Sequence, residues 1–142
     1  MANLKFAVVG IINNGGKILV VQKKKYKDSD SLSYKWHIPG GGVEENENFY
    51  SAIEREIFEE LGIKVKSQGI IDIHVVRISE KDNRNFIVVI WHKCAPLQTS
   101  ITKINNKELS DAKWVTKSEV ASFVDKEAVD LWPPLIKEYF LV

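Results

Sequence analysis

The chain has 142 residues, a length typical of one folded domain, so we expect residues 1–142 to form a single domain. Hydrophobic residues make up 44% and charged residues 27% of the chain, which excludes long disordered or collagen-like segments and favours a packed core. The formal net charge of +1 offers no global field to attract DNA, although it conceals an uneven distribution of charge along the chain, and no nucleic-acid partner is expected.

Membrane and compartment signals are weak. The longest apolar stretch, Phe6–Ile12, is interrupted by Gly10 and is far shorter than the ~20 residues needed to span a bilayer. The one cysteine, Cys94, cannot form a disulfide within the chain, so no oxidising compartment is needed. We therefore expect no membrane association and a cytoplasmic location.

The chain begins with two β-rich runs. Phe6–Ile12 and Lys17–Gln22 are joined by Asn14-Gly15, a dipeptide typical of tight hairpin turns. These runs predict an antiparallel pair of strands. A lysine-rich polar segment continues to Ser33 and predicts a loop.

A glycine-rich segment precedes the strongest helical pattern. Trp36–Val43 contains Pro39 and three consecutive glycines, which predicts an irregular turn. From Phe49 to Leu61 an apolar residue recurs at every fourth position, which predicts a helix with one apolar face. Asn48 is the expected N-cap, and Gly62 is the expected C-terminal stop.

The second half predicts a further hairpin and two helices. Ile70–Ile78 and Phe86–Ala95 read as strands joined by a polar loop, and Trp114-Val115 reads as a short strand. Thr116 and Glu119 have the spacing of a capping box, which predicts a helix from that point. After Pro133-Pro134 a final short helical run extends through Leu135, Ile136 and Tyr139.

Acidic residues concentrate between Glu44 and Glu60, where seven glutamates accompany a single cation, Arg55. Glu56, Glu59 and Glu60 stand at i, i+3 and i+4, so their carboxylates emerge on one side of the expected helix. Like charges at these spacings repel each other, and a bound divalent cation would reverse that repulsion. Oxygen ligands of this kind favour Mg²⁺ or Mn²⁺.

This segment resembles a known family. Gly41, five residues, Glu47, seven residues, Arg55-Glu56-Ile57, one residue, Glu59-Glu60, one residue and Gly62-Ile63 together resemble the complete signature box of the Nudix hydrolases. Pro39-Gly40 directly before the box also resembles the family. The resemblance implies an α+β fold, a Nudix-type α/β/α sandwich with a mixed, curved β-sheet.

The resemblance also implies roles for residues of the box. Glu56, Glu59 and Glu60 would ligate Mg²⁺ or Mn²⁺ together with the main-chain carbonyl of Gly40, and one of them would polarise water. Arg55 would orient the carboxylates. Glu47 would be a secondary ligand or a partner of Arg55.

Four further residues are candidates for direct roles. In the family the general base often lies on a later loop, so Glu108 is the first candidate and Asp111 the second. Lys23 ends the second expected strand, where related enzymes often contact phosphate, although a charged loop tip is the alternative for the lysines at 23–27. Gly41 lets the main chain approach a substrate phosphate closely.

The resemblance implies hydrolysis of a nucleoside diphosphate linked to another group. The proline and the tyrosine that mark ADP-ribose and dinucleoside polyphosphate enzymes beyond the box are absent from Ile78–Glu80. By elimination we favour a nucleoside triphosphate pyrophosphohydrolase that releases the monophosphate and pyrophosphate, with a small-molecule nucleotide as its partner. An ADP-ribose or dinucleoside polyphosphate pyrophosphatase, a non-catalytic nucleotide-binding module, an isoprenoid diphosphate isomerase and a homodimer are left open.

Overall fold

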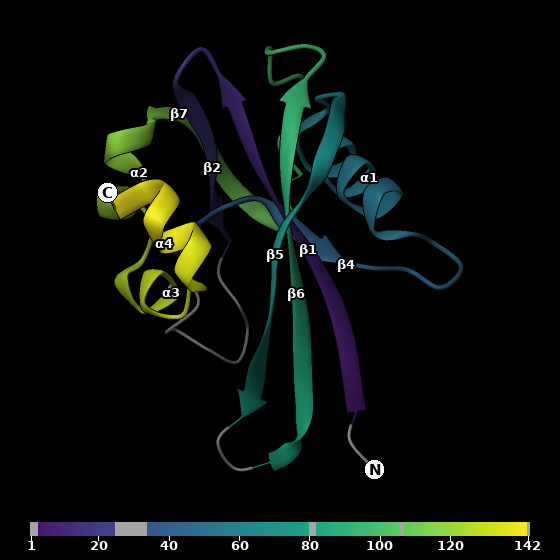
Figure 1. Cartoon of the computed structure of the whole chain (residues 1–142). Coiled ribbons are helices and arrows are strands. Elements are labelled where there is room, and N and C mark those ends of the chain that lie inside the picture. Colours follow the sequence, from purple (N-terminus) through teal and green to yellow (C-terminus); the bar gives the residue numbers. More distant parts are fainter. Residues whose placement is uncertain (1–2, 25–33, 80–81, 106, 142) are drawn as a thin grey trace.

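The computed structural model describes residues 3–24, 34–79, 82–105 and 107–141. Its centre is a mixed β-sheet (Figure 1). The strands are β1 (Asn3–Asn14), β2 (Lys17–Lys23), β3 (Trp36–His37), β4 (Gly40–Gly42), β5 (Val65–Ser79), β6 (Asp82–Pro96) and β7 (Leu109–Thr116). The helices are α1 (Phe49–Leu61), α2 (Val120–Phe123), α3 (Lys126–Asp130) and α4 (Pro134–Leu141), with a 3₁₀ turn, η1, at Lys117–Glu119.

The sheet has the order β3-β2-β1-β6-β5, with β4 also paired to β1 and β7 to β2. β1 and β6 run parallel and the other neighbours are antiparallel. One face packs against α1 through a core that includes Ile53, Ile57 and Ile90. The other face packs against the C-terminal helices through a core that includes Trp91 and Trp132. The α+β sandwich expected from the sequence is confirmed.

The first hairpin forms as predicted, with its turn shifted by one residue. Asn14 pairs with Lys17, so the two turn residues are Gly15 and Gly16, with φ angles of 59° and 90°. Both central positions of such a turn need positive φ, which glycine adopts more readily than asparagine.

Helix α1 begins and ends at the predicted residues. The Asn48 side chain accepts a hydrogen bond from the Ser51 amide at 2.8 Å, which satisfies one free donor of the first turn. Gly62 has a φ of 66°, and its amide donates to the Phe58 carbonyl. Ile53, Ile57 and Leu61 of the apolar stripe are fully buried against the sheet, and Phe49 is partly buried.

The prediction of an irregular turn over Trp36–Val43 is wrong in part, because the segment contains β3 and β4. His37 pairs with Val21 of β2, and Gly40 pairs with Val9 of β1. A Cβ atom on Gly40 would overlap the carbonyl oxygen of Val8. Gly40 therefore permits a close approach of β4 to β1, which local sequence patterns do not reveal.

Other boundaries also differ from the predictions. β5 and β6 are both longer than expected, and β7 begins at Leu109 rather than at Trp114. Three register shifts along β5 interrupt the alternation that would have marked its full length. The capping box forms, since Glu119 accepts from the Thr116 amide at 3.1 Å, but α3 was not predicted. Residues 25–33 of the expected lysine-rich loop lie outside the described residues.

In the part of the chain that is described, no helix combines the length and the apolar character needed to cross a membrane.

The left-handed end of α1 gives a test of the fold. A Cβ atom at position 62 would overlap Oγ1 of Thr102, and the positive φ adds strain. We expect Gly62→Ala to lower the free energy of unfolding by ~1–3 kcal/mol, measured by denaturant titration. Gly42→Ala is the control, because a Cβ there meets nothing within 4 Å, and it should change stability by less than ~0.5 kcal/mol. Equal losses in both variants would contradict this explanation.

Candidate active site

Arg55 ties helix α1 to the loop that follows β4. Its Nε donates to Glu47 Oε2 at 2.6 Å, and its Nη2 donates to Glu47 Oε1 at 2.9 Å. Nη2 also donates to the Gly42 carbonyl at 2.9 Å. Planar two-point pairing of this kind fixes orientation as well as distance. Of the two positions expected for Glu47, the structure places it in contact with Arg55.

The same guanidinium holds two carboxylates of the helix. Its Nη1 lies 3.0 Å from Glu56 Oε1 and 3.1 Å from Glu59 Oε2. The hydrogen bond from Arg55 lowers the pKa of Glu47 to about 2, and the bond to Glu47 raises the pKa of Arg55. Glu47 and Arg55 therefore stay charged near neutral pH, and the contact with Arg55 holds Glu56 in one orientation.

An acidic cluster forms beside this network. Glu56, Glu60 and Glu108 each offer a carboxylate oxygen, and the three oxygens lie within 4.8 Å of one another. The residue Glu60 is only 1% exposed, and its Oε2 has no hydrogen-bond partner among the described residues. Burial raises the pKa of Glu60 to about 8, with the charge of Lys23 acting in the opposite direction. Burial also raises the pKa of Glu56.

A loop that is distant in sequence delivers Glu108 to this cluster. The Asn105 amide donates to the Glu60 carbonyl at 2.9 Å, which fastens the loop to the end of α1. The Asn105 carbonyl accepts from the amides of Glu108 at 3.0 Å and Leu109 at 2.8 Å. The Glu108 carbonyl accepts from the Lys24 amide at 2.8 Å. Glu108 is therefore positioned by main-chain contacts on both sides.

The structure does not bring all of the expected ligands together. Glu59 is exposed and contacts Arg55, so within the described residues it lies outside the cluster of carboxylates. Asp111, the second candidate for the general base, accepts from the Ala112 amide at 2.7 Å and is also outside the cluster. Glu108, expected as the base, takes the third place in the cluster.

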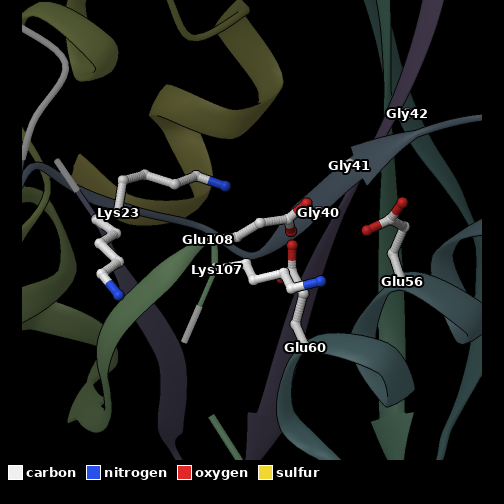
Figure 2. A pocket seen from close by; sticks show the side chains of 9 residues that line it. Lys23, Gly40, Gly41, Gly42, Glu56, Glu60, Lys107 and Glu108 are labelled. Carbon is white, nitrogen blue, oxygen red and sulfur yellow. The ribbon is translucent and has the colours of Figure 1, made fainter. Parts of the chain in front are cut away.

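A pocket of about 280 Å³ opens over the cluster. Figure 2 shows Glu56 and Glu60 on α1 reaching toward the β4 glycines, with Glu108 and Lys107 on the other side. The lining consists of glycines, lysines and glutamates: Lys23, Lys24, Gly40, Gly41, Gly42, Glu56, Glu60, Lys107 and Glu108. Lys107 was missed in the sequence, where only its adjacency to Glu108 could have indicated it. Lys24 and Gly42 were considered only as members of the lysines at 23–27 and of the glycine-rich segment.

The donor set fits a hard divalent cation. The three groups offer only oxygen ligands, which Mg²⁺ and Mn²⁺ prefer. The unpartnered Oε2 of Glu60 is a buried acceptor that a cation would satisfy. Lysines on the same pocket wall offer positive charge to an anionic substrate. The pocket can therefore hold a cation and phosphate groups next to each other.

Gly41 makes room for Glu56. A Cβ atom at position 41 would overlap the Glu56 carboxylate, so any larger residue would displace that side chain. We expect Gly41→Ala to weaken Mg²⁺ binding by ~10–100-fold, the range seen when groups supporting a metal ligand are lost. Titration calorimetry measures the affinity.

The matched control is again Gly42→Ala, which adds a methyl group to open space in the same strand. Folding stability should be nearly unchanged in Gly41→Ala, because the end of the Glu56 side chain can move aside. Unaltered Mg²⁺ affinity in Gly41→Ala would contradict the expectation that Glu56 must keep this position to bind the cation.

The buried carboxyl of Glu60 predicts a pH dependence of stability in metal-free protein. The pKa of Glu60 is raised from 4.5 to about 8 in the folded protein. The contribution of Glu60 to stability is therefore full below about pH 4.5 and is lost as the pH rises to about 8. We expect the Tm of the wild type to fall relative to Glu60→Gln over this range by at least ~5 °C, measured in the presence of a chelator. Parallel Tm profiles for the two proteins would refute this assignment.

The chain is similar to several known proteins. A family model for the NUDIX domain matches residues 1–135. An 8-oxo-dGTP diphosphatase from Buchnera aphidicola subsp. Schizaphis graminum is 41% identical over 58 residues, which are 41% of this chain and 42% of that protein. The nucleoside triphosphatase NudI from Enterobacter sp. strain 638 is 28% identical over 131 residues, which are 87% of this chain and 90% of that protein.

A solved structure shares the fold. The crystal structure of a MutT protein from Methanosarcina mazei Go1 superposes with a TM-score of 0.72 at 19% identity and covers 99% of this chain and 92% of that chain. The family model spans nearly all of the sequence, and the signature box lies where α1 and β4 meet over the pocket. The chain therefore belongs to the Nudix hydrolase family.

Proposed function

We propose that this chain is a divalent-cation-dependent pyrophosphohydrolase that converts a nucleoside triphosphate to the monophosphate and pyrophosphate. The observation that carries this proposal is the cluster of Glu56, Glu60 and Glu108 in a pocket that lysines also line. Such a pocket attracts both the cation and the polyphosphate chain. The names of the 8-oxo-dGTP diphosphatase and the nucleoside triphosphatase among the relatives support a triphosphate substrate.

Glu56, Glu60 and Glu108, with the Gly40 carbonyl, would hold Mg²⁺ or Mn²⁺. When bound, the cation neutralises charge on the phosphate oxygens and makes a water molecule more acidic. Glu59, which shares Arg55 Nη1 with Glu56, is proposed as an outer carboxylate that joins the site when a second cation binds.

The chain's own side chains would supply the remaining functions. Lys23 and Lys107 would bind the phosphate oxygens and keep the anhydride next to the carboxylates. Arg55 would keep Glu56 ionised and correctly oriented. Glu108 would accept a proton from water, whose oxygen attacks phosphorus while the P–O bond to the departing pyrophosphate breaks.

The proposed substrate favours a cytoplasmic location for this protein. We propose that location because nucleoside triphosphates are abundant there and because Cys94 is a buried free thiol, consistent with a reducing compartment. Burial raises the pKa of the Cys94 thiol to about 12. The thiol is therefore neutral near pH 7 and unsuited to act as a nucleophile.

The decisive experiment is the removal of one charge from the cluster. We expect Glu60→Gln to lower kcat for pyrophosphate release by at least ~100-fold, because an electrostatic ligand is lost from the reacting centre. The assay uses Mg²⁺ and a panel of nucleoside triphosphates, with products identified by mass. Glu45→Gln, an exposed change in the same acidic segment, should keep wild-type activity.

The same panel separates the alternatives. ADP-ribose, dinucleoside polyphosphates and isopentenyl diphosphate are added as competing substrates. Preferred cleavage of one of the first two, formation of an allylic isomer from the third, or binding of nucleotides without turnover would each replace the proposal. Full activity in Glu60→Gln would remove its physical basis.

A further inference from the structure

The sheet continues beyond the helix that covers it. On the face that packs against α1, the row Val8, Ile90 and Ile73 is followed by the row Phe6, Val88 and Val75, as the pairing of β1, β6 and β5 shows. The first row is buried at Val8 and Ile90, whereas the second extends past Phe49 at the start of the helix. Figure 1 shows β1, β5 and β6 reaching well past the helices.

This extension carries an apolar surface, which we call the arm patch and define as Leu4, Phe6, Ile73, Val75, Phe86 and Val88. Leu4 is 54%, Phe6 41%, Ile73 51% and Val75 59% exposed. Side chains of this size expose roughly 150–200 Å² when free, so these four leave roughly 350 Å² uncovered. This area is within the ~300–600 Å² of the largest apolar patch on a typical monomer, and such patches are often functional.

We propose that the arm patch is the interface of a homodimer, with the arm patch of a second copy of this chain as its occupant. A two-fold axis doubles the apolar contribution to roughly 700 Å², about half of a small stable interface of ~1,200–1,400 Å². Polar groups at the rim would supply the remainder, which is the usual composition of such interfaces.

The charged residues at the two margins of the arm patch favour a second copy of this chain over a partner whose surface carries charges of only one sign. Arg77 lies at the β5 margin, in the same row as Leu4 and Phe86. Glu44 and Glu45 follow β4 at the opposite margin, where the Val43 amide donates to the Phe6 carbonyl at 2.9 Å. Glu44 already lies 3.5 Å from Arg55 of its own chain, so the exposed Glu45 is the main acidic group there for a second copy. A two-fold axis along the strands sets the β5 margin of one copy over the β1 margin of the other, so opposite charges face each other.

The contact is between sheet faces rather than between strand edges. β5 is the last strand in the sheet order, but Asp72 Oδ1 accepts from the Ile73 amide at 2.8 Å. This carboxylate occupies a donor that an added strand would need, and the three register shifts in β5 further disrupt the edge. Charges and bulges of this kind protect edges from pairing.

The test is the oligomeric state of the full chain. Sedimentation equilibrium between about 1 and 200 µM should give a wild-type mass of twice 16.2 kDa at the upper concentrations, with micromolar dissociation. Val75→Lys and Leu4→Lys, made separately, should each raise the dissociation constant at least ~10-fold. Leu97→Lys, at a site 67% exposed outside the arm patch, should leave the dimer intact.

The variants are checked for folding by circular dichroism at concentrations where all of them are monomeric, so that loss of the dimer is separated from loss of the fold. A wild type that stays monomeric up to about 200 µM would overturn the proposal. A dimer that survives both Val75→Lys and Leu4→Lys would also overturn it. The measurement uses neither nucleotide nor metal, so its result is independent of the proposed catalytic function.

Discussion

The buried carboxyl of Glu60 is the constraint on which the site depends. An ionised carboxylate removed from water costs several kcal/mol unless a positive charge or hydrogen bonds compensate it. Here the nearest charges include Glu56 and Glu108, which raise the pKa further, and Lys23, which lowers it. The fold thus holds the Glu60 carboxyl group in an environment that favours its neutral form. A bound cation would reverse this preference and favour the ionised form.

The environments of Glu47 and Glu60 shift the pKa values of these two carboxyl groups in opposite directions. Arg55 gives Glu47 a two-point partner and lowers its pKa to about 2, whereas burial raises the pKa of Glu60 to about 8. The first group is a permanent anion that holds the loop to the helix. The second is an acceptor whose charge depends on what binds beside it. Glu56 belongs to both environments, because it contacts Arg55 and also contributes to the cluster.

Local sequence was sufficient for the parts of the site that lie on one helix. The spacing of Arg55, Glu56 and Glu60 follows from the helical repeat, and the caps at Asn48 and Gly62 fixed the ends of that helix. It was insufficient for Glu59, because the spacing at i+3 shows which side of the helix a residue occupies but not which neighbour its side chain selects.

Tertiary contacts decided the remainder. Glu108 reaches the cluster through Asn105 and the end of α1, a contact between segments nearly fifty residues apart that no periodicity encodes. The close approach of Gly40 to β1 likewise depends on strand pairing and not on the local pattern. The length of β5 was hidden because its register shifts break the alternation of apolar and polar residues.

The pocket and the arm patch share one strand, β1. β1 pairs with the β4 glycines through Ala7, Val8 and Val9, and the next residue toward the N-terminus, Phe6, belongs to the arm patch. The Phe6 carbonyl accepts from Val43 at the start of the loop that Arg55 holds through Glu47. A second copy seated on the arm patch would therefore restrict the same backbone that positions Glu56, because close-packed elements transmit displacement to their neighbours.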